Sequence, residues 1–136
     1  MKFSRFAGLG LCAIEQDNMT AARMHAMCAQ AAVADRTEWF EDRDVVETLL
    51  ARLEVKDGMP SRAADRLARA AAALASRDVY LWARLELERS HVLRLLDQDG
   101  AMDIIRGIES ATTQMQSPPL HRDISRQREL VESIPQ

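Results

Sequence analysis

The stretch DGMPSRAADRLARA, residues 57–70, decides the fold that the sequence predicts. Asp57 and Gly58 break the preceding helix, and Pro60 suits the first turn of the next one, where its missing N–H loses no hydrogen bond. The apolar side chains then follow at spacings of four and three residues, at Ala63, Leu67 and Ala70. This spacing places them on one face of an α-helix, so the stretch predicts a turn and an amphipathic helix.

The same pattern recurs at a fixed distance along the chain. Each apolar position of the quoted helix has a counterpart 41 residues before and 41 residues after it, in the sets Ala22, Ala26, Ala29 and Ile104, Ile108, Ala111. Asp17-Asn18 opens the first set and Asp99-Gly100 opens the last. A helical repeat of this length is typical of a solenoid, in which no single hairpin can bury its apolar faces alone.

Apolar stripes and break signals predict seven helices. We expect them at about residues 3–16, 19–34, 38–56, 60–75, 78–97, 100–115 and 119–133. Because the connections are short, consecutive helices should pack as antiparallel hairpins. The prediction is a single domain over residues 1–136, with hairpins at about 3–36, 37–76 and 78–116 and a capping helix at about 119–133.

Composition supports an all-α fold. Hydrophobic residues make up 47% of the chain but aromatic residues only 4%, and the apolar content is mostly Ala, Leu and Met, which favour helices over strands. The net charge is -3 and no dense Lys/Arg cluster occurs, so we expect no nucleic-acid partner. No segment has the roughly 20 apolar residues of a membrane span, so we expect no membrane association.

The residues that bear metal or catalytic chemistry are scattered. Cys12 and Cys28 form no C-x-x-C pair, and the three histidines show no metal-ligand spacing. We therefore expect no enzyme activity, no metal and no cofactor. The apolar run at 6–14 is followed at once by Glu15 and lacks an export cleavage site, which favours a cytoplasmic protein with buried free thiols.

The first hairpin resembles the tetratricopeptide repeat (TPR) family. Its match consists of Phe6 at an aromatic position, the pair Leu9-Gly10, Ala13, a turn at Asp17, and then the spaced alanines of the second helix. The second hairpin matches at Leu50-Ala51 and at the quoted turn and helix; it has Glu47 at the aromatic position, and the third has Glu88 there. The resemblance covers roughly residues 3–116 and implies a right-handed superhelix of three hairpins.

The repeat of 41 residues exceeds the usual ~34 of the family by about two helical turns. The surplus extends the first helices at 37–46 and 78–87, where Trp39 and Tyr80 lie one repeat apart, as do Phe40 and Leu81. In length, such repeats are similar to those in sensor domains of large bacterial signal-transduction ATPases. The amphipathic helix at about 119–133 suits the cap that a solenoid needs at its open end.

The resemblance implies a concave groove, lined by the first helix of each pair, that binds a partner peptide. Carried over by register, the groove consists of Leu11, Val45, Thr48, Arg52, Lys56, Arg89 and Leu93. Arg52, Lys56 and Arg89 would then form a cationic strip for an acidic partner segment. The competing interpretation makes them solvated charges balanced by Glu54 and Glu86. Trp39 and Trp82 are interpreted as core fillers, and Met19, Met24 and Met27 as either core or an adaptable surface.

The predicted function is therefore that of a cytoplasmic adaptor or scaffold that binds a segment of a partner protein. One alternative is a domain of a bacterial signalling or transcription regulator that senses a ligand or peptide. Others are a chaperone for a secreted protein and a module that forms a homodimer end to end through Phe3 and Phe6.

Overall fold

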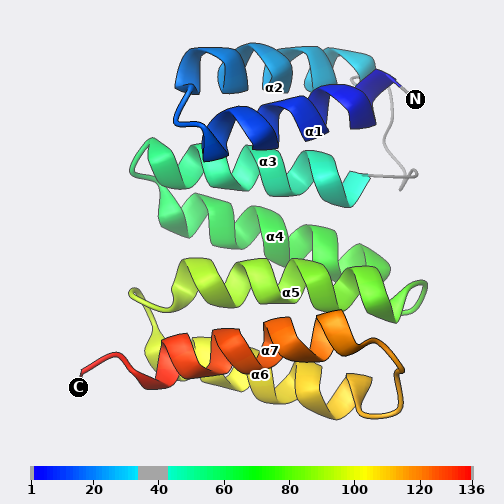
Figure 1. The fold of residues 1–136 in the computed structure, drawn as a ribbon, viewed down its shortest axis with the longest axis vertical. Coiled ribbons are helices and arrows are strands. Elements are labelled where there is room, and N and C mark those ends of the chain that lie inside the picture. Colours follow the sequence, from blue (N-terminus) through cyan, green and yellow to red (C-terminus); the bar gives the residue numbers. More distant parts are fainter. Residues whose placement is uncertain (1, 34–42, 136) are drawn as a thin grey trace. The chain divides into compact units, whose positions relative to one another are not determined.

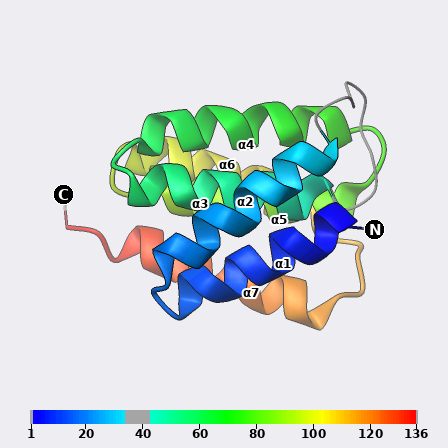
Figure 2. The ribbon, with the colours of Figure 1, turned by 90° about the horizontal axis from the view of Figure 1, so that it is seen from above.

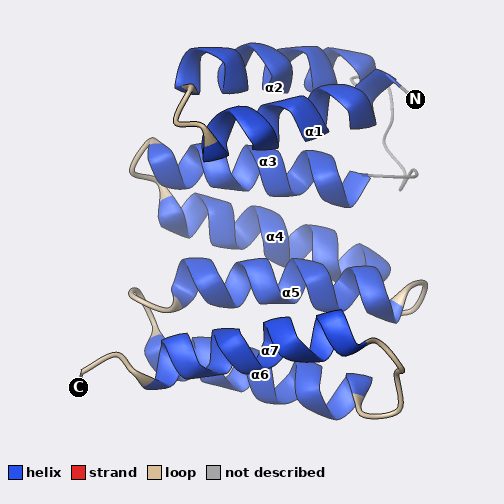
Figure 3. Ribbon diagram, in the orientation of Figure 1, coloured by secondary structure: helices blue, strands red, loops and turns tan. Residues whose placement is uncertain are grey.

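The computed structural model describes residues 2–33 and 43–135 of the chain. Within these ranges the secondary structure consists of seven α-helices and contains no strand (Figure 3). This confirms the all-α prediction. No helix in the described ranges is long and apolar enough to cross a membrane.

The helices lie close to their predicted positions: α1 Lys2–Glu15, α2 Met19–Val33, α3 Arg43–Lys56, α4 Pro60–Leu74, α5 Val79–Leu93, α6 Gln98–Thr112 and α7 Pro118–Glu132. The main differences are at the α5–α6 connection. The Asp97 carboxylate accepts a hydrogen bond from the Gly100 N–H at 2.9 Å, which caps α6 two residues before its predicted start. The predicted beginning of the third helix, including Trp39 and Phe40, lies outside the described residues.

The chain divides into two compact units, residues 1–59 and 60–136, and the division falls at the turn between Met59 and Pro60. In the first unit α1 packs against α2 and α3, and α2 also packs against α3 (Figures 1 and 2). Its core contains Ala7, Ala13, Ala22, Ala26, Ala29, Val46, Leu49 and Leu53. Alanines dominate this core, so the helices can approach one another closely.

Gly10 lies where α1 crosses α3. A Cβ atom at Gly10 would lie 2.6 Å from the Cδ2 atom of Leu49 and 3.0 Å from its Cδ1 atom. Leu49 is itself fully buried. The small residue at this position is therefore required by the packing of the two helices, as the sequence predicted.

The repeat also appears in the backbone of the first unit. Asp17 (φ 58°) follows α1, and Gly58 (φ 78°) follows α3. Both residues adopt the left-handed conformation that ends helices, and they are 41 residues apart. The sequence period thus corresponds to a repeated helix-ending turn.

The second unit is arranged around α5, which packs against α4, α6 and α7 (Figure 1). Its core cluster contains Ala83, Leu87, Ala101, Met102, Ile104, Ile105, Ile108, Leu120, Ile124 and Val131. Eight of the nine positions in the 41-residue pattern are buried, and Ala111 is the exception. Thr112 is buried in its place because the apolar face of α6 continues from Ile108 by four residues, and its hydroxyl donates to the Ile108 carbonyl at 2.7 Å.

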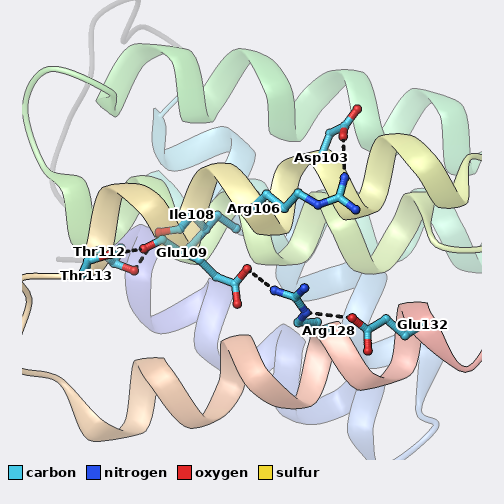
Figure 4. Close-up of polar contacts among 8 residues, drawn as sticks. All are labelled: Asp103, Arg106, Ile108, Glu109, Thr112, Thr113, Arg128 and Glu132. Atoms are coloured by element: carbon cyan, nitrogen blue, oxygen red, sulfur yellow. Dashed lines mark hydrogen bonds and ion pairs between the residues drawn. The ribbon is translucent and has the colours of Figure 1, made fainter.

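Polar contacts fasten α7 to α6 (Figure 4). The Arg128 guanidinium donates to Glu109 on α6 at 2.6 Å and to Glu132 on α7 at 2.8 Å. The Gln98 side chain, at the start of α6, donates to the Val131 carbonyl at 2.8 Å. These hydrogen bonds hold α7 against α6. The buried side chains of Leu120, Ile124 and Val131 add apolar contacts to the core cluster that α7 shares with α6.

Candidate functional site

The second unit has an open pocket of about 520 Å³. Three helices and the cap of α6 surround it, and its lining comprises Ala64, Asp65, Ala68, Trp82, Glu86, Arg89, Leu93, Asp97, Gly100, Asp103, Ile104 and Gly107. This volume lies within the range of roughly 300–1,000 Å³ found for ligand pockets in proteins. The pocket is therefore the candidate functional site.

Helix α5 supplies one wall of the pocket. Trp82, Glu86, Arg89 and Leu93 follow one another at spacings of four, three and four residues, which places all four on one face of the helix. Leu93 is also the last residue of α5. An aromatic ring, a carboxylate, a guanidinium and an apolar side chain thus line the pocket in order along a single helix.

Small residues on the opposing helices keep the pocket open. Helix α4 contributes Ala64 and Ala68, and α6 contributes Gly100 and Gly107. At Gly107 no atom lies within 4 Å of the place a Cβ would occupy. The space is consequently preformed, and an occupant would not have to displace a side chain at this point.

Glu86 is the most buried charged group in the pocket, with 7% of its surface exposed. Its nearest cation is Arg89, whose Nη2 atom lies 3.4 Å from Glu86 Oε2, and this ion pair lacks the geometry of a hydrogen bond. Burial raises the pKa of Glu86 above its usual value, and the nearby Arg89 charge offsets part of that effect. The carboxylate is therefore only partly compensated by its surroundings.

The remaining carboxylates lie nearer to solvent. Asp97 caps α6, and Asp103 forms an ion pair with Arg106 at 3.1 Å on the exposed surface of α6 (Figure 4). Asp65 on α4 is exposed. Together with Glu86 they place four carboxylates around the pocket, against the guanidiniums of Arg89 in the lining and of Arg106 beside Asp103. Carboxylates thus outnumber guanidiniums around the pocket, which favours a cationic occupant.

The described residues contain no group of three or more His, Cys, Asp or Glu side chains that could hold a metal ion. Trp82, Leu93 and Ile104 present apolar surface, and the carboxylates present hydrogen-bond acceptors.

The structure brings together two of the predicted groove residues, since Arg89 and Leu93 both line the pocket. The others belong to the first unit. Leu11 and Val45 are partly buried against its core, and the Thr48 hydroxyl donates to the Asp44 carbonyl at 2.8 Å. Arg52 is half-buried and Lys56 is exposed. A groove or cationic strip that joins these residues to Arg89 stays a prediction.

The structure also bears on several other sequence interpretations. Arg89 forms an ion pair with Glu86, as the balanced-charge interpretation expected, but Arg52 and Arg89 are half-buried and of the three cations only Lys56 is exposed to solvent. The two cysteines are free, but Cys12 is exposed because it lies on the outer face of α1. Of the two interpretations left open for the methionines, exposure agrees with the surface one for Met24 and Met27, which are 57% and 70% exposed on α2.

Trp82 is half-buried, as the core interpretation required, but it also lines the pocket. The sequence reasoning missed Glu86 as a site residue, together with Asp65, Asp103 and Gly107. One available signal was the position of Glu86 between Leu85 and Leu87, both of which are buried. Comparisons of the chain with protein-family models, with curated proteins and with solved structures find no match.

Proposed function

We propose that the chain is a cytoplasmic interaction module that binds a segment of a partner protein. In this proposal its helices form three TPR-like hairpins, closed by α7, in a right-handed superhelix. The repeated helix-ending turn at Asp17 and Gly58 and the buried 41-residue pattern support this architecture. The function is that of an adaptor or scaffold.

The observation that carries the binding function is the pocket between α4, α5 and α6. Trp82, Leu93 and Ile104 would contact the apolar part of a bound segment, while the surrounding carboxylates would orient its polar groups. Because Ala64, Ala68 and Gly107 leave the space open beforehand, little ordering cost opposes binding. Aromatic anchors in preformed pockets are frequent centres of binding energy in protein interfaces.

The test uses a variant that fills the pocket. Gly107→Leu places a branched side chain where the structure leaves room for it, and Ser125→Leu adds the same side chain at an exposed position of α7 that does not line the pocket. Partners are captured from the native host with the full-length wild-type chain and identified by mass spectrometry. Their affinities for the wild type and both variants are then measured by calorimetry with purified components.

We expect Gly107→Leu to weaken binding by at least about tenfold and Ser125→Leu to leave it unchanged. Circular dichroism would verify that both variants are folded. If a folded Gly107→Leu variant binds every captured partner as tightly as the wild type, the pocket is not the binding site and the proposal is wrong.

A ligand-sensing domain is a second candidate, because a pocket of about 520 Å³ also suits a small molecule. This function predicts that a nucleotide-binding or DNA-binding module is encoded in the same or a neighbouring reading frame. It also predicts that small-molecule extracts of the host raise the melting temperature of the wild type but not that of Gly107→Leu.

A further inference from the structure

We propose that the pocket binds an arginine side chain of the partner segment, with the guanidinium held between the Trp82 ring and the carboxylates of Glu86 and Asp103. This inference rests on the proposed function and specifies the chemistry of the partner. It reverses the sign of the charge expected from the sequence, which predicted an acidic segment along a strip of basic residues.

The first support is the charge balance of the pocket lining. Asp65, Glu86, Asp97 and Asp103 face the guanidinium of Arg89, and Arg106 pairs with Asp103 at 3.1 Å, so two negative charges remain in excess around the pocket when all groups are ionised. The chain as a whole has a net charge of only -3 over 136 residues, so the pocket concentrates negative charge locally. Such a site attracts cations and repels an acidic segment.

The second support is the state of Glu86. The residue is only 7% exposed in a wall of the pocket, yet within the described residues the only polar contact of its carboxylate is the 3.4 Å ion pair with Arg89. Ionised carboxylates in well-formed pairs accept hydrogen bonds at about 2.7–2.9 Å and can accept several of them. Glu86 therefore retains acceptor capacity at a largely buried position in the pocket wall, and an incoming donor would complete its hydrogen bonding.

Trp82 provides the third support and favours arginine over lysine. It lies one helical turn before Glu86 on the same face of α5 and lines the same pocket. A guanidinium can stack on an indole ring while its edge donates hydrogen bonds to carboxylates, because its donors lie in one plane. An ammonium group cannot do both in this manner. The combination of ring and buried carboxylate thus selects a planar cation.

The chain's own Arg89 does not already supply the guanidinium that Glu86 and Trp82 would bind. Its Nη2 atom approaches Glu86 from the following turn of the same helix, and its Nε atom is buried without a hydrogen-bond partner in the described residues. It therefore neutralises Glu86 incompletely and is itself incompletely satisfied. A second guanidinium from the partner would still meet an excess of carboxylate, because Asp65 on α4 and Asp97 at the start of α6 also line the pocket, while Asp103 already pairs with Arg106.

The experiment measures the fluorescence of Trp82 during titration with short peptides. Because the chain has two tryptophans, the full-length protein carries Trp39→Phe so that the signal comes from Trp82 alone. The probes are three blocked tripeptides, acetyl-Ala-X-Ala-amide, in which X is arginine, its neutral isostere citrulline, or glutamate. The variants are Glu86→Gln and Asp103→Asn, and the control is Glu129→Gln, which removes an exposed carboxylate on α7 outside the pocket.

We expect the arginine peptide to bind about tenfold or more tightly than the citrulline peptide, and the glutamate peptide to bind weakest. Glu86→Gln should abolish this roughly tenfold preference for the arginine peptide over the citrulline peptide. Asp103→Asn should reduce the preference, and Glu129→Gln should leave it intact. Thermal unfolding separates binding from folding. Since burial penalises the charged form of Glu86, the Gln variant should be at least as stable as the wild type at neutral pH while binding less well.

Two results would overturn the inference. One is equal affinity for the arginine and citrulline peptides, and the other is an unchanged preference in Glu86→Gln. If the natural partner still loses affinity for Gly107→Leu under either result, the pocket remains the binding site and only the cationic chemistry is wrong. If Gly107→Leu has no effect on any partner, the proposed function itself fails.

Discussion

The close approach of α1 and α3 leads to a quantitative prediction about two glycines of the same helix. Gly8 and Gly10 both lie inside α1, so replacement by alanine should stabilise each helical backbone by about 1 kcal/mol. At Gly8 the added methyl meets nothing within 4 Å. Gly8→Ala should therefore raise the free energy of unfolding by about 0.5–1 kcal/mol.

At Gly10 the same change meets the Leu49 side chain. The new methyl would lie 2.6 Å from Leu49 Cδ2, whereas non-bonded carbons prefer about 3.5–4.0 Å, so one side chain or helix must move by about 1 Å. Leu49 is fully buried, and overpacking of a buried site costs about 1–3 kcal/mol. Gly10→Ala should thus be about 1–3 kcal/mol less stable than Gly8→Ala, although the two changes are chemically identical.

Urea unfolding followed by circular dichroism measures this difference, and a double-mutant cycle identifies its cause. Leu49→Ala alone should cost about 2–5 kcal/mol, but it removes the two atoms that obstruct the methyl. In that background Gly10→Ala should become stabilising, with a coupling energy of about 1–3 kcal/mol. Equal stability of the two single alanine variants, or a coupling energy near zero, would refute the crossing of α1 over α3 at Gly10.

The other predictions concern the repeated turn and the buried carboxylate. Gly58→Ala should destabilise the chain by about 1 kcal/mol because an L side chain is strained at positive φ, and Asp17→Gly should stabilise it for the same reason; urea unfolding that shows no effect of either change would contradict the turn geometry. For Glu86 the pKa is raised in the folded state, so its favourable contribution is complete below the ordinary carboxyl pKa and is lost as the pH rises through the folded value. Glu86→Gln should therefore match the wild type near pH 4 and exceed it in melting temperature increasingly toward neutral pH, whereas a constant difference across this range would be inconsistent with the burial of the carboxylate.

The positions of the helices could be predicted from the sequence because the residues that begin and end a helix lie next to it in the chain. Pro60 begins α4 as predicted, and Ser117 precedes Pro118 at the start of α7, although its side chain makes no capping hydrogen bond. The start of α6 was misjudged because Asp99-Gly100 looked like the break. The Asp97 carboxylate instead caps the helix at the earlier residue, which places Gly100 in the first turn.

The pocket was not predictable in the same way, since it depends on which residues of separate helices face one another. Glu86 looks like a surface charge when only its type is considered, and its burial follows from the packing of α4 and α6 on either side of α5. Gly107 carries no pattern signal, although it leaves part of the pocket open. Arg89 and Leu93 were found because the family register pointed to that face of α5.

The alanine-built core of the first unit makes its response to substitution asymmetric. Five of the eight residues in its described core cluster are alanine, against two of ten in the cluster that α5, α6 and α7 form in the second unit. An alanine has only one methyl to lose, so truncation can open no large void, while any larger side chain must force two closely spaced helices apart. Random variation should therefore damage the first unit mainly by enlarging residues, and the isoleucine- and leucine-rich cluster of α5, α6 and α7 mainly by shrinking them.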